Sequence, residues 1–120
     1  MARIVIVDDS SADLKLMESI LRSGNHQVSA LSDPLTAEAV IAREKPDLVL
    51  LDVVMPLRNG YEVLRDLKRN SATSELPVIL VSSKSNDTDV RWGMRQGARD
   101  YVIKPYTAEQ VLASVQKVLG

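Results

Sequence analysis

The chain has 120 residues, of which 45% are hydrophobic and 26% charged, a composition typical of one globular domain. Its 15 basic and 16 acidic residues give a net charge of −1, which argues against a general nucleic-acid-binding protein because such proteins carry a basic excess. The lack of cysteine excludes disulfides and sulfur-ligated metal sites, and no apolar run approaches the ~18 residues of a membrane span. We expect one soluble, cytoplasmic domain covering residues 1–120.

Short apolar runs alternate with amphipathic stretches in the N-terminal half. The β-branched run at residues 4–7 predicts a strand buried on both faces. Ser10 and Asp13 have the spacing of a capping box, and they begin the first predicted helix. Residues 27–31 alternate polar and apolar side chains, which indicates an edge strand, and Pro34 opens a second helix.

The alternation continues to the end of the chain. Residues 48–51 are the most apolar run and predict the central strand, and residues 78–81 and 101–103 predict two more. The spacing of apolar residues predicts the three remaining helices. The third helix contains Tyr61, Leu64 and Leu67, and the fourth contains Val90, Met94 and Gly97. The last helix contains Val111, Leu112, Val115, Val118 and Leu119. Five strands alternating with five helices predict an α/β fold, a flavodoxin-like (βα)5 doubly wound parallel sheet with strand order 2-1-3-4-5.

Polar side chains stand at the carboxyl ends of four predicted strands. They are Asp8 and Asp9, then Asp52, Ser82 and Lys104. Ligands of open parallel sheets bind at this edge, so we expect these residues to share one crevice. Three carboxylates repel one another unless a cation lies between them, and an all-oxygen site suits Mg²⁺ or Mn²⁺.

These residue types predict a site that accepts a phosphoryl group. Asp52 stands alone after the most apolar strand, and a carboxylate held against a metal is an oxygen nucleophile able to form an acyl phosphate. Phosphoryl transfer needs positive charge on the peripheral oxygens, which the metal and Lys104 would supply. Ser82 can donate a hydrogen bond to a third oxygen.

The whole chain resembles the receiver domains of bacterial response regulators, the CheY-like family. The residues that carry the resemblance are Asp8, Asp9, Asp52, Ser82 and the pair Lys104-Pro105. It implies that Asp52 accepts phosphate from a phosphohistidine on a sensor histidine kinase. It also implies that Asp9, Asp52 and the Val54 carbonyl bind Mg²⁺ directly, that Asp8 acts mainly through metal-bound water, and that the Lys104-Pro105 peptide is cis.

The same resemblance implies a conformational switch. Phosphate on Asp52 would draw the Ser82 hydroxyl inward and let Tyr101 rotate from exposed to buried. This would alter the face formed by the fourth helix, fifth strand and fifth helix, to which a downstream protein binds. Trp92 and Arg95 on the fourth helix are candidate partner contacts. The alternatives are that Tyr101 only packs in its strand, that Trp92 packs locally, and that the arginines form a solvated stripe.

Residues 1–4 and 92–101 resemble the PilH-like, single-domain regulators of type IV pilus systems. This implies a CheA-like kinase as phosphodonor and a role in twitching motility or pilus-based taxis. We expect a stand-alone regulator, either a monomer or a phosphorylation-dependent dimer. Val54 and Lys84 follow the acceptor and the hydroxyl residue by two positions, and neither is an acid or amide that would orient an attacking water. Loss of the phosphoryl group is therefore expected to be slow.

Three other functions compete with this interpretation. A phosphorylation-independent interaction module on the same fold usually lacks one of the acids or the lysine, and this chain keeps them all. An FMN carrier needs a hydroxyl- and glycine-rich phosphate loop where Asp8 and Asp9 stand, and a haloacid-dehalogenase-like phosphatase has Asp-x-Asp rather than adjacent acids. We therefore expect no enzyme beyond a domain that assists its own phosphorylation and dephosphorylation, and no DNA binding.

Overall fold

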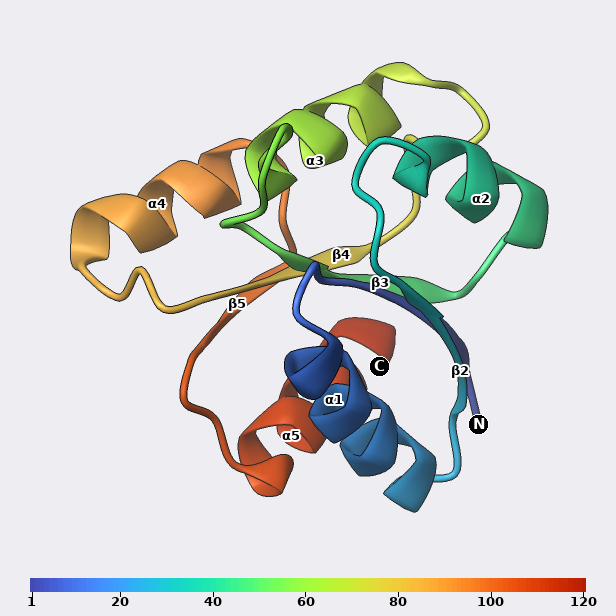
Figure 1. The fold of residues 1–120 in the computed structure, drawn as a ribbon, viewed down its shortest axis with the longest axis vertical. Coiled ribbons are helices and arrows are strands. Elements are labelled where there is room, and N and C mark those ends of the chain that lie inside the picture. Colours follow the sequence, from blue (N-terminus) through green and yellow to red (C-terminus); the bar gives the residue numbers. More distant parts are fainter.

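The computed structural model describes residues 1–120 and shows five strands alternating with five helices. The strands are β1 (Arg3–Val7), β2 (Gln27–Leu31), β3 (Leu48–Asp52), β4 (Val78–Ser82) and β5 (Asp100–Ile103). The helices are α1 (Ser11–Ser23), α2 (Ala37–Glu44), α3 (Gly60–Arg69), α4 (Asp87–Arg95) and α5 (Ala108–Leu119). All strands pair in parallel in the order β2-β1-β3-β4-β5, which confirms the predicted fold class and strand order (Figure 1).

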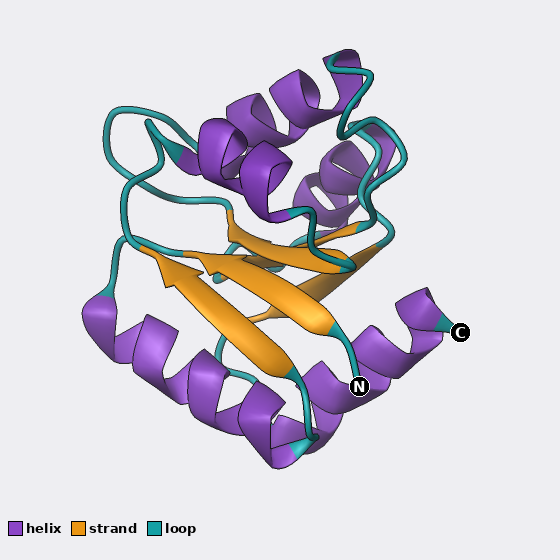
Figure 2. Ribbon diagram, turned by 90° about the vertical axis from the view of Figure 1, so that its right-hand side faces the viewer, coloured by secondary structure: helices purple, strands orange, loops and turns teal.

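Helices cover both faces of the sheet, with α1 and α5 on one face and α2, α3 and α4 on the other (Figures 1 and 2). Successive residues of a strand point to opposite faces, so β1 contributes Ile4 and Ile6 to the core under α1 and α5. Val5 and Val7 enter the core on the other face. The continuous β-branched run is therefore buried on both sides, as predicted.

The order of the strands explains their composition. β3 lies between β1 and β4, and all five of its residues are buried. β2 lies at one edge and contains no fully buried residue, which confirms the expected edge strand. None of the helices combines the length and apolar character that crossing a membrane requires.

Two predicted helices differ from those observed. α2 begins at Ala37 rather than Pro34, because Pro34 lies in a turn whose Asp33 carboxylate accepts a hydrogen bond from the Leu35 amide at 2.9 Å. In α4 the predicted apolar face of Val90, Met94 and Gly97 differs from the face that packs, since Met94 is 41% exposed and Gly93 faces the sheet instead.

Gly93 and Gly97 show why the apolar spacing of α4 misled the prediction. A Cβ on Gly93 would come within 2.8 Å of the Leu80 side chain and 3.1 Å of the Tyr101 ring. The missing side chain therefore lets α4 lie directly against β4 and β5. Gly97 comes after α4 has ended, in a left-handed conformation with φ of 106°.

Candidate functional site

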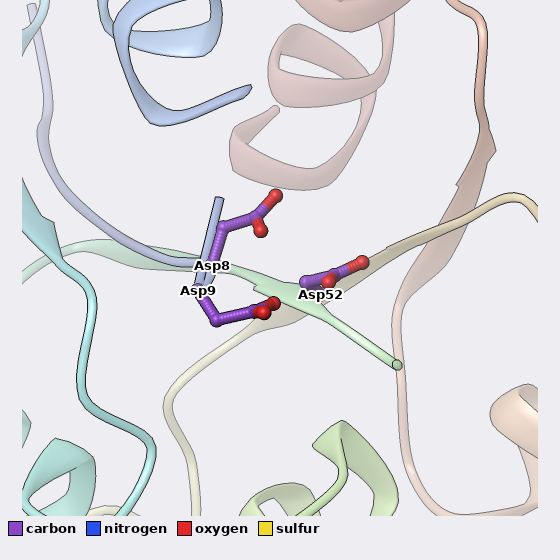
Figure 3. Close-up of side chains that lie close together, drawn as sticks. All are labelled: Asp8, Asp9 and Asp52. Carbon is purple, nitrogen blue, oxygen red and sulfur yellow. The ribbon is translucent and has the colours of Figure 1, made fainter. Parts of the chain in front are cut away.

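Three carboxylates converge where β1 and β3 end side by side. One oxygen each from Asp8, Asp9 and Asp52 lies within 4.8 Å of the other two (Figure 3). Asp8 and Asp52 are buried, whereas Asp9 is exposed and leaves the site open to solvent. Such a set of carboxylate oxygens with an open side fits a hard divalent cation such as Mg²⁺, which keeps several water or phosphate ligands.

Lys104 reaches these acids from the loop after β5. Its Nζ lies 3.0 Å from Asp8 Oδ2, 2.9 Å from Asp13 Oδ2 and 3.3 Å from Asp52 Oδ1. Burial alone would lower the pKa of Lys104, but the hydrogen bonds to Asp13 and Asp8 and the nearby Asp52 charge raise it above its ordinary value. The ammonium is therefore a permanent positive charge at this site.

The charges of the site are not balanced. Burial, followed by the Asp8 charge, raises the pKa of Asp52 from 3.8 to about 6, although Lys104 acts in the opposite direction. A single ammonium thus does not compensate the carboxylates that surround it. This excess of negative charge is a second reason why the residues fit a divalent cation.

The side chains of Ser82 and Tyr101 both form hydrogen bonds with the backbone of Lys84. Ser82 is fully buried at the end of β4, and its Oγ accepts a hydrogen bond from the Lys84 amide at 3.1 Å. The Tyr101 hydroxyl donates to the Lys84 carbonyl at 2.8 Å. We expected Tyr101 to be exposed in the unphosphorylated protein. It is instead half-buried, with its ring against Gly93.

The loop between β3 and α3 carries Val54, whose side chain is exposed. One backbone hydrogen bond and two ion pairs hold this loop. The Gly60 amide donates to the Val53 carbonyl at 2.8 Å, in a place where a Cβ would come within 2.2 Å of the Asp52 carbonyl oxygen. The Arg58 guanidinium pairs with Glu38 of α2 and Asp66 of α3.

The structure brings Asp8, Asp9, Asp52 and Lys104 together, as the sequence predicted. Trp92 and Arg95 lie elsewhere, in a shallow depression on the outer side of α4 that they share with Thr88 and Arg91. Both residues are exposed and do not belong to this site. The Lys104-Pro105 peptide is cis, as expected.

Asp13 was missed as a member of the site. Ser10 does cap α1, because its side chain accepts a hydrogen bond from the Asp13 amide at 3.3 Å. The predicted capping box was nevertheless wrong, since the Asp13 carboxylate pairs with Lys104 and the Ser10 amide donates to Asp8 Oδ1 at 2.9 Å. The sequence carried no separate signal for this role, because an acid in the first turn of a helix has a local explanation as part of the helix start.

Comparison with known proteins agrees with this geometry. Residues 4–116 match the family of response regulator receiver domains. The chain belongs to this family, as its resemblance to CheY-like proteins indicated.

The chain is 44% identical to protein PilH of Pseudomonas aeruginosa, over 100% of this chain and 99% of that protein. It is 38% identical to the response regulator PleD of Caulobacter vibrioides, of which it covers 26%. The BeF3-activated receiver domain of RstA from Klebsiella pneumoniae superposes with a TM-score of 0.89 and 33% identity, over 98% of this chain and 97% of that one. The chemotaxis protein CheY4 of Vibrio cholerae shares the fold, with a TM-score of 0.91, 24% identity and 98% coverage of both chains.

Proposed function

We propose that residues 1–120 act as one receiver domain that accepts a phosphoryl group on Asp52. Receivers of this family take phosphate from histidine kinases and act on downstream targets. The observation that carries the proposal is the position of Asp52, whose Oδ1 lies 3.3 Å from Lys104 Nζ and whose carboxylate lies beside two further acids.

The transfer step needs only groups found at this site and the donor. A carboxylate oxygen of Asp52 attacks the phosphorus atom of a phosphohistidine whose ring is protonated on its other nitrogen, an O–P bond forms, and the P–N bond breaks to release neutral imidazole. Lys104 offsets the negative charge of the phosphoryl oxygens, and the Ser82 hydroxyl donates a hydrogen bond to one of them. Asp8, Asp9, Asp52 and the Val54 carbonyl would hold Mg²⁺ or Mn²⁺, which supplies further positive charge when bound.

We propose further that Ser82 and Tyr101 transmit the modification to the surface formed by α4, β5 and α5. Their shared contact with the Lys84 backbone supports this role. The same surface exposes Trp92 and Arg95 on α4, which we propose as contacts for a downstream protein.

The full-length similarity to PilH supports a role in pilus-linked motility signalling. We propose a CheA-like histidine kinase as the phosphodonor and a protein, rather than a nucleic acid, as the downstream target. The proposed phosphodonor can be tested by incubating the chain with phosphorylated kinases and measuring which of them transfers phosphate fastest.

The proposal is tested with acetyl phosphate and Mg²⁺, followed by measurement of the intact mass. The wild type is expected to gain one phosphoryl group, and Asp52→Asn none. Asp33→Asn, at an exposed aspartate in a surface turn, is the matched control and should be labelled like the wild type. An unlabelled wild type, or a labelled Asp52→Asn variant, would contradict the proposal and favour a phosphorylation-independent interaction module.

A further inference from the structure

The Lys104 ammonium is fully engaged by carboxylates. It donates hydrogen bonds to Asp8 Oδ2 at 3.0 Å and Asp13 Oδ2 at 2.9 Å, and it forms an ion pair with Asp52 Oδ1 at 3.3 Å. An ammonium has three N–H donors and no acceptor. A phosphoryl oxygen on Asp52 can therefore gain a donor from Lys104 only if one of these contacts is given up.

Asp13 is the partner that can be released at the lowest cost. Its side chain is 40% exposed, whereas those of Asp8 and Asp52 are 12% and 7% exposed. Water can replace Lys104 at an exposed carboxylate, but a buried carboxylate would lose its partner without compensation. Asp8 is also held by the Ser10 amide at 2.9 Å.

The position of Asp13 in α1 lowers this cost further. It lies in the first turn of the helix, where backbone amides and the helix dipole favour negative charge. Asp13 therefore remains stabilised after Lys104 has left it. Asp52 lacks this support, because it lies at the end of β3.

We propose that Asp13 is a positioning residue that competes with the phosphoryl group for Lys104, and this inference rests on the proposed function. In the unmodified protein Asp13 holds the ammonium and compensates part of its charge. When Asp52 carries a phosphoryl group, Lys104 turns the donor that it gave to Asp13 towards a phosphoryl oxygen, and the Asp13 carboxylate is released to water. Asp13 thereby sets how tightly the site holds a phosphoryl group.

The proposal predicts opposite effects on two ligands when Asp13 is neutralised. At saturating Mg²⁺, beryllofluoride should bind Asp13→Asn about three- to tenfold more tightly than the wild type. The variant lacks the carboxylate that competes with this ligand for Lys104, and it lacks a nearby negative charge that repels the ligand. Mg²⁺ alone should bind about three- to tenfold more weakly, because the Lys104 charge is less compensated. Loss of structure would instead weaken both.

Titration calorimetry of Mg²⁺ and of beryllofluoride tests this prediction. Glu109→Gln is the matched control, because it removes an exposed acid from the first turn of α5 and no contact to Lys104. It should leave both affinities near the wild-type values. Asp13→Glu keeps the carboxylate and should restore wild-type affinities for both ligands.

The variants are first compared with the wild type by circular dichroism and urea unfolding. If Asp13→Asn does not fold, Asp13→Ser provides the same test, since serine is well tolerated at helix starts. Beryllofluoride affinity that is unchanged or reduced in folded Asp13→Asn or Asp13→Ser would overturn the proposal, and so would an equal change in Glu109→Gln. A wild type that cannot be phosphorylated would contradict the proposed function, whereas phosphorylation of the wild type with unresponsive Asp13 variants would contradict this inference alone.

Discussion

Replacing Asp52 by Asn removes a charge that the cation-free fold holds at a cost in stability. Burial and the Asp8 charge raise the pKa of Asp52 from 3.8 to about 6, so the folded state binds this proton more tightly than the unfolded state. Stability is therefore greatest below the unfolded-state pKa and is lost as pH rises through this interval. A shift of roughly two units at about 1.4 kcal/mol each amounts to about 3 kcal/mol at neutral pH.

The amide of Asn resembles the neutral carboxyl group, so Asp52→Asn should raise the free energy of unfolding at pH 7.5. We expect a gain of about 1–3 kcal/mol, because the lost contact with Lys104 offsets part of the benefit. Lys104 keeps its hydrogen bonds to Asp8 and Asp13 in the variant. At pH 4 the gain should largely disappear, since Asp52 is then mostly protonated in the folded wild type.

Urea unfolding of the wild type and Asp52→Asn at both pH values, with a chelator present, measures this difference. Adding Mg²⁺ should stabilise the wild type more than the variant, because a ligand that binds only the folded state adds more stability the more tightly it binds. Glu109→Gln serves as the control for removing an exposed acid. Lower stability of Asp52→Asn than of the wild type at pH 7.5 would refute the reasoning that burial makes this carboxylate unfavourable.

Four other predictions concern contacts around the site. Tyr61 has a buried hydroxyl without a hydrogen-bond partner, so Tyr61→Phe should leave the free energy of unfolding in urea unchanged or raise it. Tyr101→Phe loses the hydrogen bond to the Lys84 carbonyl and should lower the free energy of unfolding by about 1 kcal/mol. Burial raises the pKa of Tyr61 to about 12, so stability should fall as pH rises from about 10 towards 12, and absorbance titration should show Tyr61→Phe without this late phenolate. Gly60→Ala should destabilise the fold by about 2 kcal/mol in urea, because its Cβ would overlap the backbone at the end of β3. The double variant Val54→Asn, Lys84→Glu should lose its phosphoryl group about tenfold faster than the wild type, and equal decay in a mass-spectrometric time course would contradict the role of these positions.

The sheet could be predicted from the sequence because buried parallel strands are apolar at every position. Residues 48–51 of β3 show this pattern up to Asp52, and β2 shows the alternation of an edge strand. The helices carry a weaker signal. In α4 the residue nearest the sheet is Gly93, which has no side chain and so does not contribute to an apolar periodicity.

The strand-end members of the site could also be predicted, because the topology alone brings the ends of β1 and β3 together. Asp13 and Arg58 could not be predicted in the same way. An acid near a helix start has a local explanation as a cap, and its contact with Lys104 depends on the path of the loop after β5. Arg58 joins α2 to α3 across a loop whose course no residue pattern specifies.

The Lys84 backbone gives the proposed switch a direct physical link. The Ser82 hydroxyl accepts from the Lys84 amide, and the Tyr101 hydroxyl donates to the carbonyl of the same residue. If Ser82 turns towards a phosphoryl oxygen, the Lys84 amide loses its acceptor and the loop after β4 must move to satisfy it. That movement would displace the carbonyl that holds Tyr101, so in the proposed switch the aromatic ring against Gly93 would respond to a change at Asp52 without any contact between them. The link uses only backbone atoms of Lys84, and it should therefore persist when the Lys84 side chain is replaced.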